Sequence, residues 1–371
     1  MAVGQALAAY FQPMKLKGEK LLRQLTQAHA VPGYEGEVRE IFCKQLEGAG
    51  KFSTDRNGSV LCTLPGKGPR VLLAGHMDEV GFRVQSITAT GFLKLVPLGG
   101  WWTHTLMAQR LQVKTSGGRK VMGVVSSKPP HFLSEAERKQ VMSLENMFLD
   151  LGATSREEVL GWGVRVGDPV APLTDFAALE HQGRFLAKAF DNRVGMGGTI
   201  EAGNKLAAAK CSNTVLLAGT VQEEVGLRGA QTLAAMAKPD VAVILEGTPA
   251  DDTPGFTLDT SQGIMGRGVQ IRMHDPSAIM NPKLAELAID TAEKEKIPYQ
   301  VAVRAGGGTD AGRLHLAGEG VPCVVLGVPA RYIHSHQSMI ELADYQATVK
   351  LATALVKRLT AAEVKKLTKY L

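Results

Sequence analysis

Four short, continuous apolar runs constrain the fold of this chain more than any other feature. They are VLLAGH at residues 71–76, NTVLLAGT at 213–220, VAVILE at 241–246 and PCVVLGV at 322–328. Runs of this length without alternating polar positions are typical of strands covered on both faces, as in a parallel sheet between two layers of helices. Several of the intervening stretches have the apolar spacing of helices. The pattern therefore predicts a three-layer α/β/α domain with a mixed, mainly parallel sheet.

Residues 81–172 have a different texture, which indicates a second domain. Short β-like runs such as FRVQSI, FLKLVPL, RLQVKT and VMGVVS are separated there by glycine and polar turns. Spacing this short is typical of a small β-rich domain of the barrel type. We predict that residues 1–82 and 178–371 form the α/β domain and that residues 83–177 form a β-barrel-like insertion. Helices are expected at 16–30, 35–49, 192–209, 229–237, 282–296 and 342–370, the last as one long helix.

Composition argues against several classes of protein. The chain has 371 residues, of which 44% are hydrophobic and 21% charged, values that are ordinary for a globular protein. The net charge of +6 is scattered along the chain, so we expect no nucleic-acid partner. The N-terminus lacks a cleavable leader pattern, and no apolar run approaches the roughly 18 residues that a membrane span needs. Four cysteines without C-x-x-C spacing suggest a reducing compartment, so we expect a cytoplasmic protein with no membrane partner.

Side chains that can bind metal ions stand at or shortly after the ends of the apolar runs. Taken singly, each has an ordinary structural interpretation, such as a residue at a helix N-terminus, a turn residue or a hydrogen-bonded core histidine. Ligands in open α/β sheets bind outside the carboxyl ends of the strands, so we expect these side chains to meet at one edge. No lysine cluster accompanies them, and divalent metal ions are therefore the predicted counter-charge. The residues are His76, Asp78, Glu223, Glu224, Glu246, His334 and His336, with Asp191 at the entrance of a helix.

The residue types favour a pair of metal ions. Imidazoles and carboxylates without thiolates suit zinc, manganese or cobalt, and an aspartate can bridge two ions roughly 3.5 to 4 Å apart. Adjacent side chains of extended backbone point in opposite directions, so one of Glu223 and Glu224 is expected to bind metal while the other moves a proton. Asp78, two residues after His76, is expected to accept the second ring N–H of that histidine. This combination predicts a two-metal hydrolase.

An ordered set of motifs resembles one known family, the TET-type deblocking and glutamyl aminopeptidases. The motifs are AGHMDEVGF, SSKPPH, AFDNRVG, QEEVGLRGA, GGGTDAG and RYIHS, which span nearly the whole chain. The resemblance implies an α/β catalytic domain interrupted by a β domain that makes oligomer contacts, in dimers that build up to a dodecamer. It also implies two divalent ions per subunit, with Zn²⁺ expected before Co²⁺ or Mn²⁺.

The same resemblance implies a role for each candidate residue. Asp191 would bridge the ions, Glu224 and His334 would complete the pair, and His76 and Glu246 would hold different ions. Glu223 would be the general base and acid, with Asp78 behind His76. Two positions depart from the simple pattern, because many relatives have Asp in place of Glu246 and because His336 competes with His334 as a ligand.

The predicted reaction is the removal of N-terminal residues from short peptides, with Glu223 passing a proton from the attacking water to the leaving amine. A metal-dependent deacylase of N-acyl amino acids, a glycan hydrolase and a non-catalytic metal-binding scaffold are the alternatives. Paired metals disfavour the glycan hydrolase, because glycosidases ordinarily use two bare carboxylates. The GGGTDAG stretch at 306–312 lacks the G-K-[ST] ending of a phosphate loop. We expect it to crowd the site, with Asp310 capping the next helix.

Overall fold

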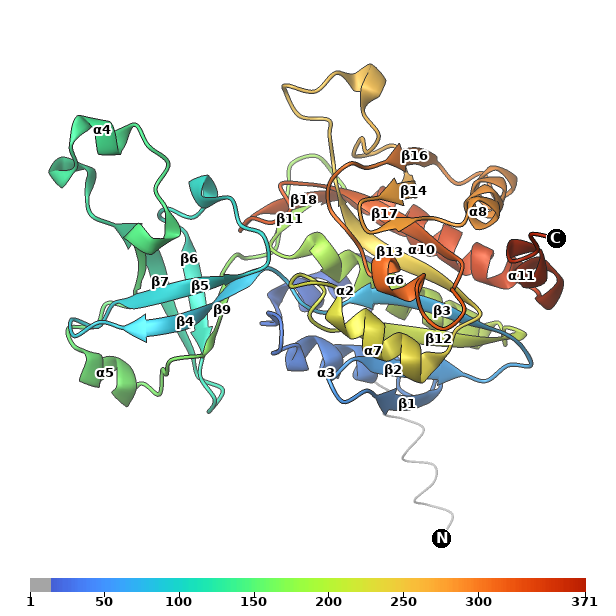
Figure 1. Ribbon diagram of the computed structural model, residues 1–371, viewed down its shortest axis with the longest axis horizontal. Coiled ribbons are helices and arrows are strands. Elements are labelled where there is room, and N and C mark those ends of the chain that lie inside the picture. Colours follow the sequence, from blue (N-terminus) through green and yellow to red (C-terminus); the bar gives the residue numbers. More distant parts are fainter. Residues whose placement is uncertain (1–14) are drawn as a thin grey trace, which may run out of the picture.

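The computed structural model describes residues 15–371 and shows an α/β domain with a smaller barrel at one side (Figure 1). The chain enters the barrel directly after β3 and returns before α6. The predicted fold class is confirmed, whereas the exact domain limits stay a prediction. Within the described residues, no helix has both the length and the apolar composition needed to cross a bilayer.

The α/β domain is built on one sheet of 12 strands. Its central strands β12, β3, β13 and β17 are parallel, and antiparallel strands flank them on both sides. The main path, in spatial order, is β1 (Lys51–Thr54), β2 (Val60–Leu64), β12 (Asn213–Thr220), β3 (Gly68–His76), β13 (Val241–Pro249), β17 (Cys323–Arg331), β18 (Ser338–Glu341), β11 (Arg184–Ala187) and β10 (Ala177–Ala178). Off this path lie β14 (Val269–Asp275), β15 (Ala278–Ile279) and β16 (Tyr299–Val303).

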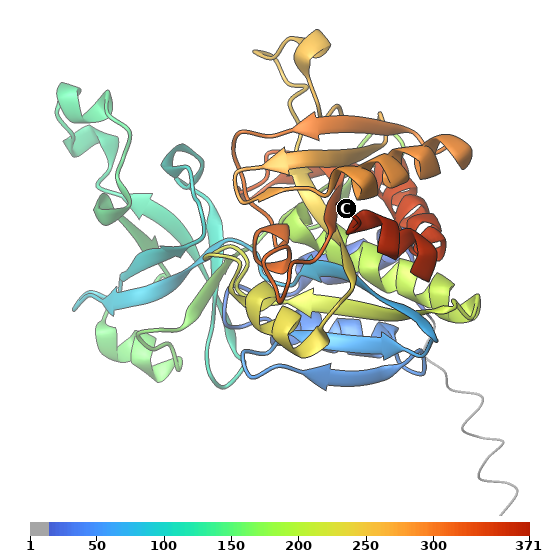
Figure 2. The same cartoon turned by 45° about the vertical axis from the view of Figure 1, so that its right-hand side comes forward.

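Helices cover both faces of the sheet, as the unbroken apolar strands require (Figures 1 and 2). One face packs against α2 (Gly18–Gln27), α3 (Gly36–Gln45), α6 (Phe190–Ala208), α8 (Pro282–Lys294) and α10 (Leu342–Arg358). The other packs against α7 (Arg228–Ala237) and α9 (Ala311–Leu314). Side chains of the central strands alternate between these two apolar clusters, so every second residue faces the same layer.

The prediction of one long C-terminal helix is wrong, because this segment forms two helices. It breaks after Arg358, and α11 (Ala361–Leu367) follows. Leu359 leaves the helical conformation with ψ +61°, and the Thr360 side chain accepts a hydrogen bond from the Glu363 N–H. Thr360 therefore caps a new helix, and capping by threonine competes with helix continuation.

The insertion is a closed barrel of six strands. In spatial order these are β4 (Gly81–Ile87), β5 (Leu93–Leu98), β8 (Met147–Asp150), β7 (Lys120–Ser127), β6 (Arg110–Lys114) and β9 (Pro169–Pro172). Two short helices, α4 (Glu135–Arg138) and α5 (Arg156–Gly161), lie in its loops. Single 3₁₀ turns occupy Thr103–Thr105, Pro130–Phe132 and Leu144–Asn146 in the barrel, and Leu258–Thr260 in the α/β domain. The barrel has its own apolar core and is a separate packing unit.

Polar contacts fix the barrel against the α/β domain. The Glu37 carboxylate of α3 accepts hydrogen bonds from the Lys114 and Lys120 ammonium groups at 2.7 and 3.0 Å. The His29 ring nitrogen Nε2 lies 3.2 Å from the Gln112 carbonyl oxygen of β6. These contacts hold the barrel beside the end of the sheet at which β3 finishes.

Candidate metal and catalytic site

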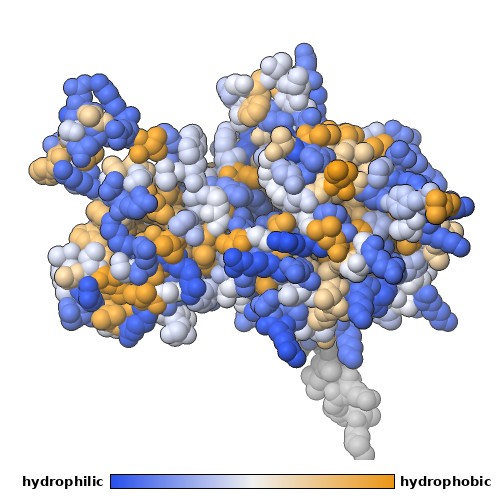
Figure 3. Space-filling view, viewed as in Figure 1, coloured by the Kyte–Doolittle hydropathy of each residue, from blue (hydrophilic) through white to orange (hydrophobic). Residues whose placement is uncertain are grey.

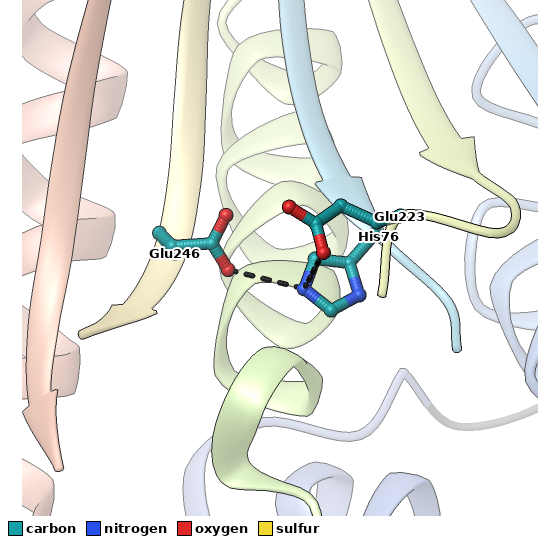
Figure 4. Close-up of side chains that lie close together, drawn as sticks. All are labelled: His76, Glu223 and Glu246. Carbon is teal, nitrogen blue, oxygen red and sulfur yellow. Dashed lines mark ion pairs between the residues drawn. The ribbon is translucent and has the colours of Figure 1, made fainter. Parts of the chain in front are cut away.

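The metal-binding candidates meet at the edge of the sheet that the apolar runs predict. His76 ends β3, Glu246 lies near the end of β13, and Asp191 stands in the non-helical first turn of α6. A cavity of about 500 Å³ opens there. Figure 4 shows three of the side chains pointing toward one another from separate segments. The cavity lining includes His76, Asp191, Glu223, Glu224, Glu246, His334 and the glycines Gly306–Gly308.

Asp191 lies at the centre of the site, with one histidine on each of its carboxylate oxygens. Its Oδ1 is 3.1 Å from Nε2 of His76, and its Oδ2 is 3.3 Å from Nε2 of His334. Each histidine has a glutamate beside it. Glu246 Oε1 lies 3.3 Å from His76 Nε2, and Glu224 Oε2 lies 3.5 Å from His334 Nε2. We call these two groups the His76 half (His76 and Glu246) and the His334 half (His334 and Glu224).

This pairing differs from the expectation that His76 and Glu246 hold different ions. The two side chains lie on the same side of Asp191, because they follow the parallel pairing of β3 and β13 by two residues in each strand. Glu223 approaches the His76 half from the other direction, with Oε2 3.8 Å from His76 Nε2. The adjacent glutamates thus point in different directions, Glu223 toward His76 and Glu224 toward His334, although both lie in a turn and not in a strand.

Both histidines present the same nitrogen to the centre because a backbone carbonyl lies at the other. His76 Nδ1 is 3.1 Å from the carbonyl oxygen of Asp78, and His334 Nδ1 is 3.0 Å from that of Gly100. A ring that donates from Nδ1 to a carbonyl has its Nε2 lone pair free for a metal ion. Gly100 belongs to the barrel, so the inserted domain contributes directly to the surroundings of the site.

The expected role of Asp78 needs correction. Its carboxylate oxygen lies 3.6 Å from His76 Nδ1, beyond hydrogen-bond distance, and the ring faces the Asp78 carbonyl instead. The carboxylate accepts the backbone N–H groups of Glu223 at 3.0 Å and Glu224 at 3.1 Å. Asp78 therefore holds the turn that carries both glutamates, and its carboxylate is committed to that turn.

The pKa shifts reflect the crowding of buried carboxylates around the two histidines. Burial, together with neighbouring carboxylates, raises the pKa of Glu223 well above its ordinary value and that of Glu224 to about 8. Burial alone would lower the pKa of His76, but the carboxylates of Glu223 and Glu246 raise it well above its ordinary range. Burial alone would also lower the pKa of His334, but the hydrogen bond to Asp191 and the charges of Glu224 and Asp191 together raise it to about 10. Crowded carboxylates that draw protons onto themselves and onto both imidazoles are typical of a site built for cations.

The donor set passes a direct test for divalent cations. Both carboxylate oxygens of Glu246 and Oε1 of Glu224 are buried without a hydrogen-bond partner among the described residues. Among the residues that line this cavity, Arg272 is the single lysine or arginine, and its guanidinium pairs with Asp275 at 3.3 Å. Buried carboxylates of this kind need a partner that the protein itself does not supply. The residues therefore fit metal ions.

Two further predictions from the sequence can be compared with the structure. His336 is buried beside Trp101, with ring centroids 5.3 Å apart, and lies outside the cavity lining, so the structure favours His334 as the ligand. Asp310 stands at the N-cap position of α9, but its side chain makes no cap hydrogen bond, which corrects the expectation. Its carboxylate instead accepts a hydrogen bond from the Thr220 hydroxyl at 2.5 Å, at the end of β12.

Sequence reasoning missed Arg272 and the segment from Gly99 to Trp101. Arg272 lies within β14, in a run without the apolar continuity that marks the other strands. The segment from Gly99 to Trp101 belongs to the barrel, where no motif connects it with the sheet edge. A glycine pair followed by two tryptophans was the available signal, because glycines permit close approach and exposed aromatics are unusual.

Comparison with known proteins agrees with this arrangement. The M42 glutamyl aminopeptidase family model matches residues 58–351, and a model described as AMPT matches residues 17–42. Putative aminopeptidase FrvX of Escherichia coli is 38% identical over 93% of this chain and 96% of its own length. Glutamyl aminopeptidase of Lactococcus lactis is 34% identical over 94% and 98%. Lysyl aminopeptidase of Pyrococcus furiosus is 32% identical over 92% and 97%.

Solved structures give the same result. A TET aminopeptidase from a marine sediment archaeon of the Thaumarchaeota has a TM-score of 0.91 and 41% identity, over 94% of this chain and 98% of that chain. The TET1 peptidase of Pyrococcus horikoshii, which can assemble into a tetrahedron or a large octahedral shell, has a TM-score of 0.82 and 32% identity over 91% and 98%. Fold and comparisons together define a peptide hydrolase, and the structure offers candidate metal-binding residues. The chain belongs to the M42 glutamyl aminopeptidase family.

Proposed function

We propose that this enzyme removes N-terminal residues from short peptides with the help of two divalent cations. The His76 half would hold one ion and the His334 half the other, with one oxygen of Asp191 facing each. The observation that carries this proposal is the position of Asp191, whose two oxygens face imidazole nitrogens on opposite sides at 3.1 and 3.3 Å. A carboxylate shared in this way is typical of paired metal sites.

Bound cations would supply Lewis acidity toward the scissile carbonyl and lower the pKa of water at neutral pH. Glu223 would then act as the base and acid. It belongs to neither half, it faces the same cavity, and burial raises its pKa above the ordinary value of a glutamate, which favours its uptake of a proton. Glu223 would take the proton of the attacking water and deliver it to the leaving amine. The acidic cavity would also favour a substrate with a positively charged α-amine.

The test is metal removal and replacement. The protein is stripped with a chelator and assayed on a panel of aminoacyl p-nitroanilides after adding Zn²⁺, Mn²⁺ or Co²⁺ separately. We expect p-nitroaniline release to return with metal, with Zn²⁺ as the first candidate. Metal that binds without restoring release from any substrate would contradict the proposal and favour a non-catalytic scaffold.

A deacylase of N-acyl amino acids is the second candidate, because paired cations suit any amide hydrolysis. The two activities differ in what they require at the N-terminus. An aminopeptidase needs the free α-amine and rejects an N-acetylated peptide, whereas a deacylase accepts the acyl group. Matched peptides with free and acetylated N-termini therefore separate them in one assay, and we expect cleavage of the free peptide alone.

We also propose that the chain assembles into homo-oligomers, from dimers up to a dodecamer. The TET1 peptidase of Pyrococcus horikoshii forms large shells. Apolar residues gather on the barrel surface in Figure 3. Several barrel residues of this kind are well exposed, namely Met122, Val124, Phe132, Val141 and Val166. Light scattering coupled to size-exclusion chromatography tests this directly, and a monomer at all concentrations would contradict it.

A cytoplasmic location is part of the same proposal. All four cysteines of the sequence are free, and this supports the proposal. A reducing compartment is the ordinary place for such a protein. Fractionation of the source cells, with detection by an antibody, tests the location.

A further inference from the structure

A short barrel segment reaches across to the His334 half of the site. It runs from Gly99 to Trp101, just after β5, and we call it the Gly99–Trp101 loop. The Gly100 carbonyl oxygen lies 3.0 Å from Nδ1 of His334. A Cβ atom built on Gly99 would lie 3.3 Å from the Cβ of Glu224. The loop thus contacts both residues of the His334 half from the barrel side.

Glycine is needed for this close approach. Gly99 has φ +86°, a conformation that other residues adopt only with strain, and a Cβ there would also lie 2.7 Å from Cγ1 of Val80. A Cβ on Gly100 would come within 3.4 Å of His334 Nδ1. Larger side chains at these positions would push the loop away from the ligands that it contacts.

Trp101 anchors the loop on both domains. Its ring stacks on Phe82 of the barrel with centroids 4.9 Å apart, and its indole N–H donates to the Gly81 carbonyl at 3.1 Å. Its other neighbour is the His336 ring, which is buried and lies two residues beyond His334. The tryptophan therefore fixes the Gly100 carbonyl relative to the turn that carries His334.

We propose that the Gly99–Trp101 loop is a positioning element of the metal site, through which the inserted barrel sets the ring orientation and tautomer of His334. The proposal rests on the two-cation site described above and adds that one half of it is completed by the barrel. His334 has a left-handed backbone (φ +58°) and a side chain that is 39% exposed. Within its own turn nothing fixes Nδ1, whereas the carbonyl of Gly100 does so from outside.

Loss of such an outer hydrogen bond typically weakens metal binding by about 10- to 100-fold. The loop contacts one half only. His76 Nδ1 donates the equivalent hydrogen bond to the carbonyl oxygen of Asp78, in its own chain segment. Displacing the loop should therefore weaken the binding of one ion and leave the binding of the other unchanged. General destabilisation of the protein would not produce this asymmetry.

The test is a Co²⁺ titration of the chelator-stripped full-length protein. Calorimetry measures the affinity for each ion, and visible absorption reports the ligand geometry of bound cobalt. Trp101→Ala is the test variant and Trp102→Ala the matched control, because Trp102 is 65% exposed and its aromatic partner is His104. We expect the wild type and Trp102→Ala to bind two ions alike. Trp101→Ala should bind one of them about 10- to 100-fold more weakly.

His334→Ala identifies the step in the titration that belongs to the His334 half. Trp101→Phe keeps the stacked ring but loses the indole N–H, so it should give an intermediate affinity for that ion and unchanged affinity for the other. If Trp101→Ala does not fold, Trp101→Phe carries the test by itself.

Equal affinities in the wild type and the Trp101 variants, or equal weakening of both ions, would overturn the positioning role. A wild type that binds fewer than two ions would instead contradict the proposed function, so the two failures are distinguishable.

Discussion

The two halves of the candidate metal site are chemically alike but are supported in different ways. In each, an imidazole Nε2 lies close both to one oxygen of Asp191 and to a glutamate. His76 is 2% exposed and belongs to the α/β domain alone, whereas His334 is 39% exposed and depends on a carbonyl of the barrel. Equivalent ligands therefore need not be equally rigid, because rigidity depends on what lies behind them.

The segment behind His76 is held by a buried ionic cluster. The Arg193 guanidinium is fully buried, donates to the Met77 carbonyl and contacts the Glu79 carboxylate at 3.0 Å. Lys188 reaches the same carboxylate at 2.5 Å. Charges this deep remain only when they are paired and hydrogen-bonded, so this cluster fixes residues 77–79 strongly. The His334 turn has no comparable cluster among the described residues.

The largest expected effect is that of a substitution which weakens metal binding in both halves alike. Asp191→Ala deletes the carboxylate that both halves share, so both ions should bind more weakly. Loss of an outer hydrogen bond costs about 10- to 100-fold in affinity, and loss of a shared ligand should exceed 100-fold for each ion. Calorimetric titration measures this, with Asp175→Ala as the exposed control. Loss of one ion alone would show that Asp191 does not serve both halves.

Glu223→Gln should have the next largest effect and should separate chemistry from metal binding. Glu223 is assigned to proton transfer and belongs to neither half, so both ions should stay bound while kcat falls by about 10²- to 10⁴-fold. Activity on aminoacyl p-nitroanilides and metal content are measured on the same sample, with Glu157→Gln as an exposed control. Full kcat with both metals bound would assign the proton transfer to another group.

The halves also differ in how far the sequence could predict them. His76 ends β3, Glu223 and Glu224 follow β12, and Glu246 lies inside β13, so sheet topology brings them together once the strands are recognised. The contact of Gly100 with His334 spans 234 positions and connects two domains, and no periodicity encodes it. The sequence places Asp78 beside the site but suggests the His76 ring as the partner of its carboxylate. The carboxylate instead accepts the backbone N–H groups of Glu223 and Glu224, which residue spacing does not reveal.

A smaller effect concerns the pH dependence of the contact between the domains. Burial lowers the pKa of His29 to about 3, from 6.5 for an exposed histidine. As the pH falls below 6.5 the unfolded chain takes up this proton while the folded chain does not, so the contribution of His29 is present above pH 6.5 and is lost toward pH 3. Between pH 7 and 5 this amounts to about 2 kcal/mol of unfolding free energy.

His29→Gln tests this, because glutamine can still donate to the Gln112 carbonyl but does not titrate. From pH 7 to pH 5 the variant should lose about 2 kcal/mol less stability than the wild type in urea unfolding. His181→Gln is the control, since that side chain is 63% exposed. Parallel pH profiles for the wild type and His29→Gln would show that His29 does not keep its neutral form in the folded protein.

The smallest expected effect is that of a substitution that loosens the barrel without changing a residue of the site. It is the sharpest test of whether the His334 half depends on the barrel. Hydrogen bonds from Lys114, Lys120 and the His29 backbone N–H together outweigh burial and lower the pKa of Glu37 to about 2, so the lysine pairs across the domains favour its charged form. The partners are partly exposed, so Glu37→Gln should cost less than about 1 kcal/mol of stability. Hydrogen exchange should nevertheless increase at the Gly99–Trp101 loop.

Glu19→Gln, which removes an exposed pair within α2, is the matched control and should leave the hydrogen exchange of that loop unchanged. If both variants leave the exchange of the loop unchanged, the barrel is held in place by apolar contacts such as Trp101 against His336, and the ionic pairs are dispensable for the His334 half.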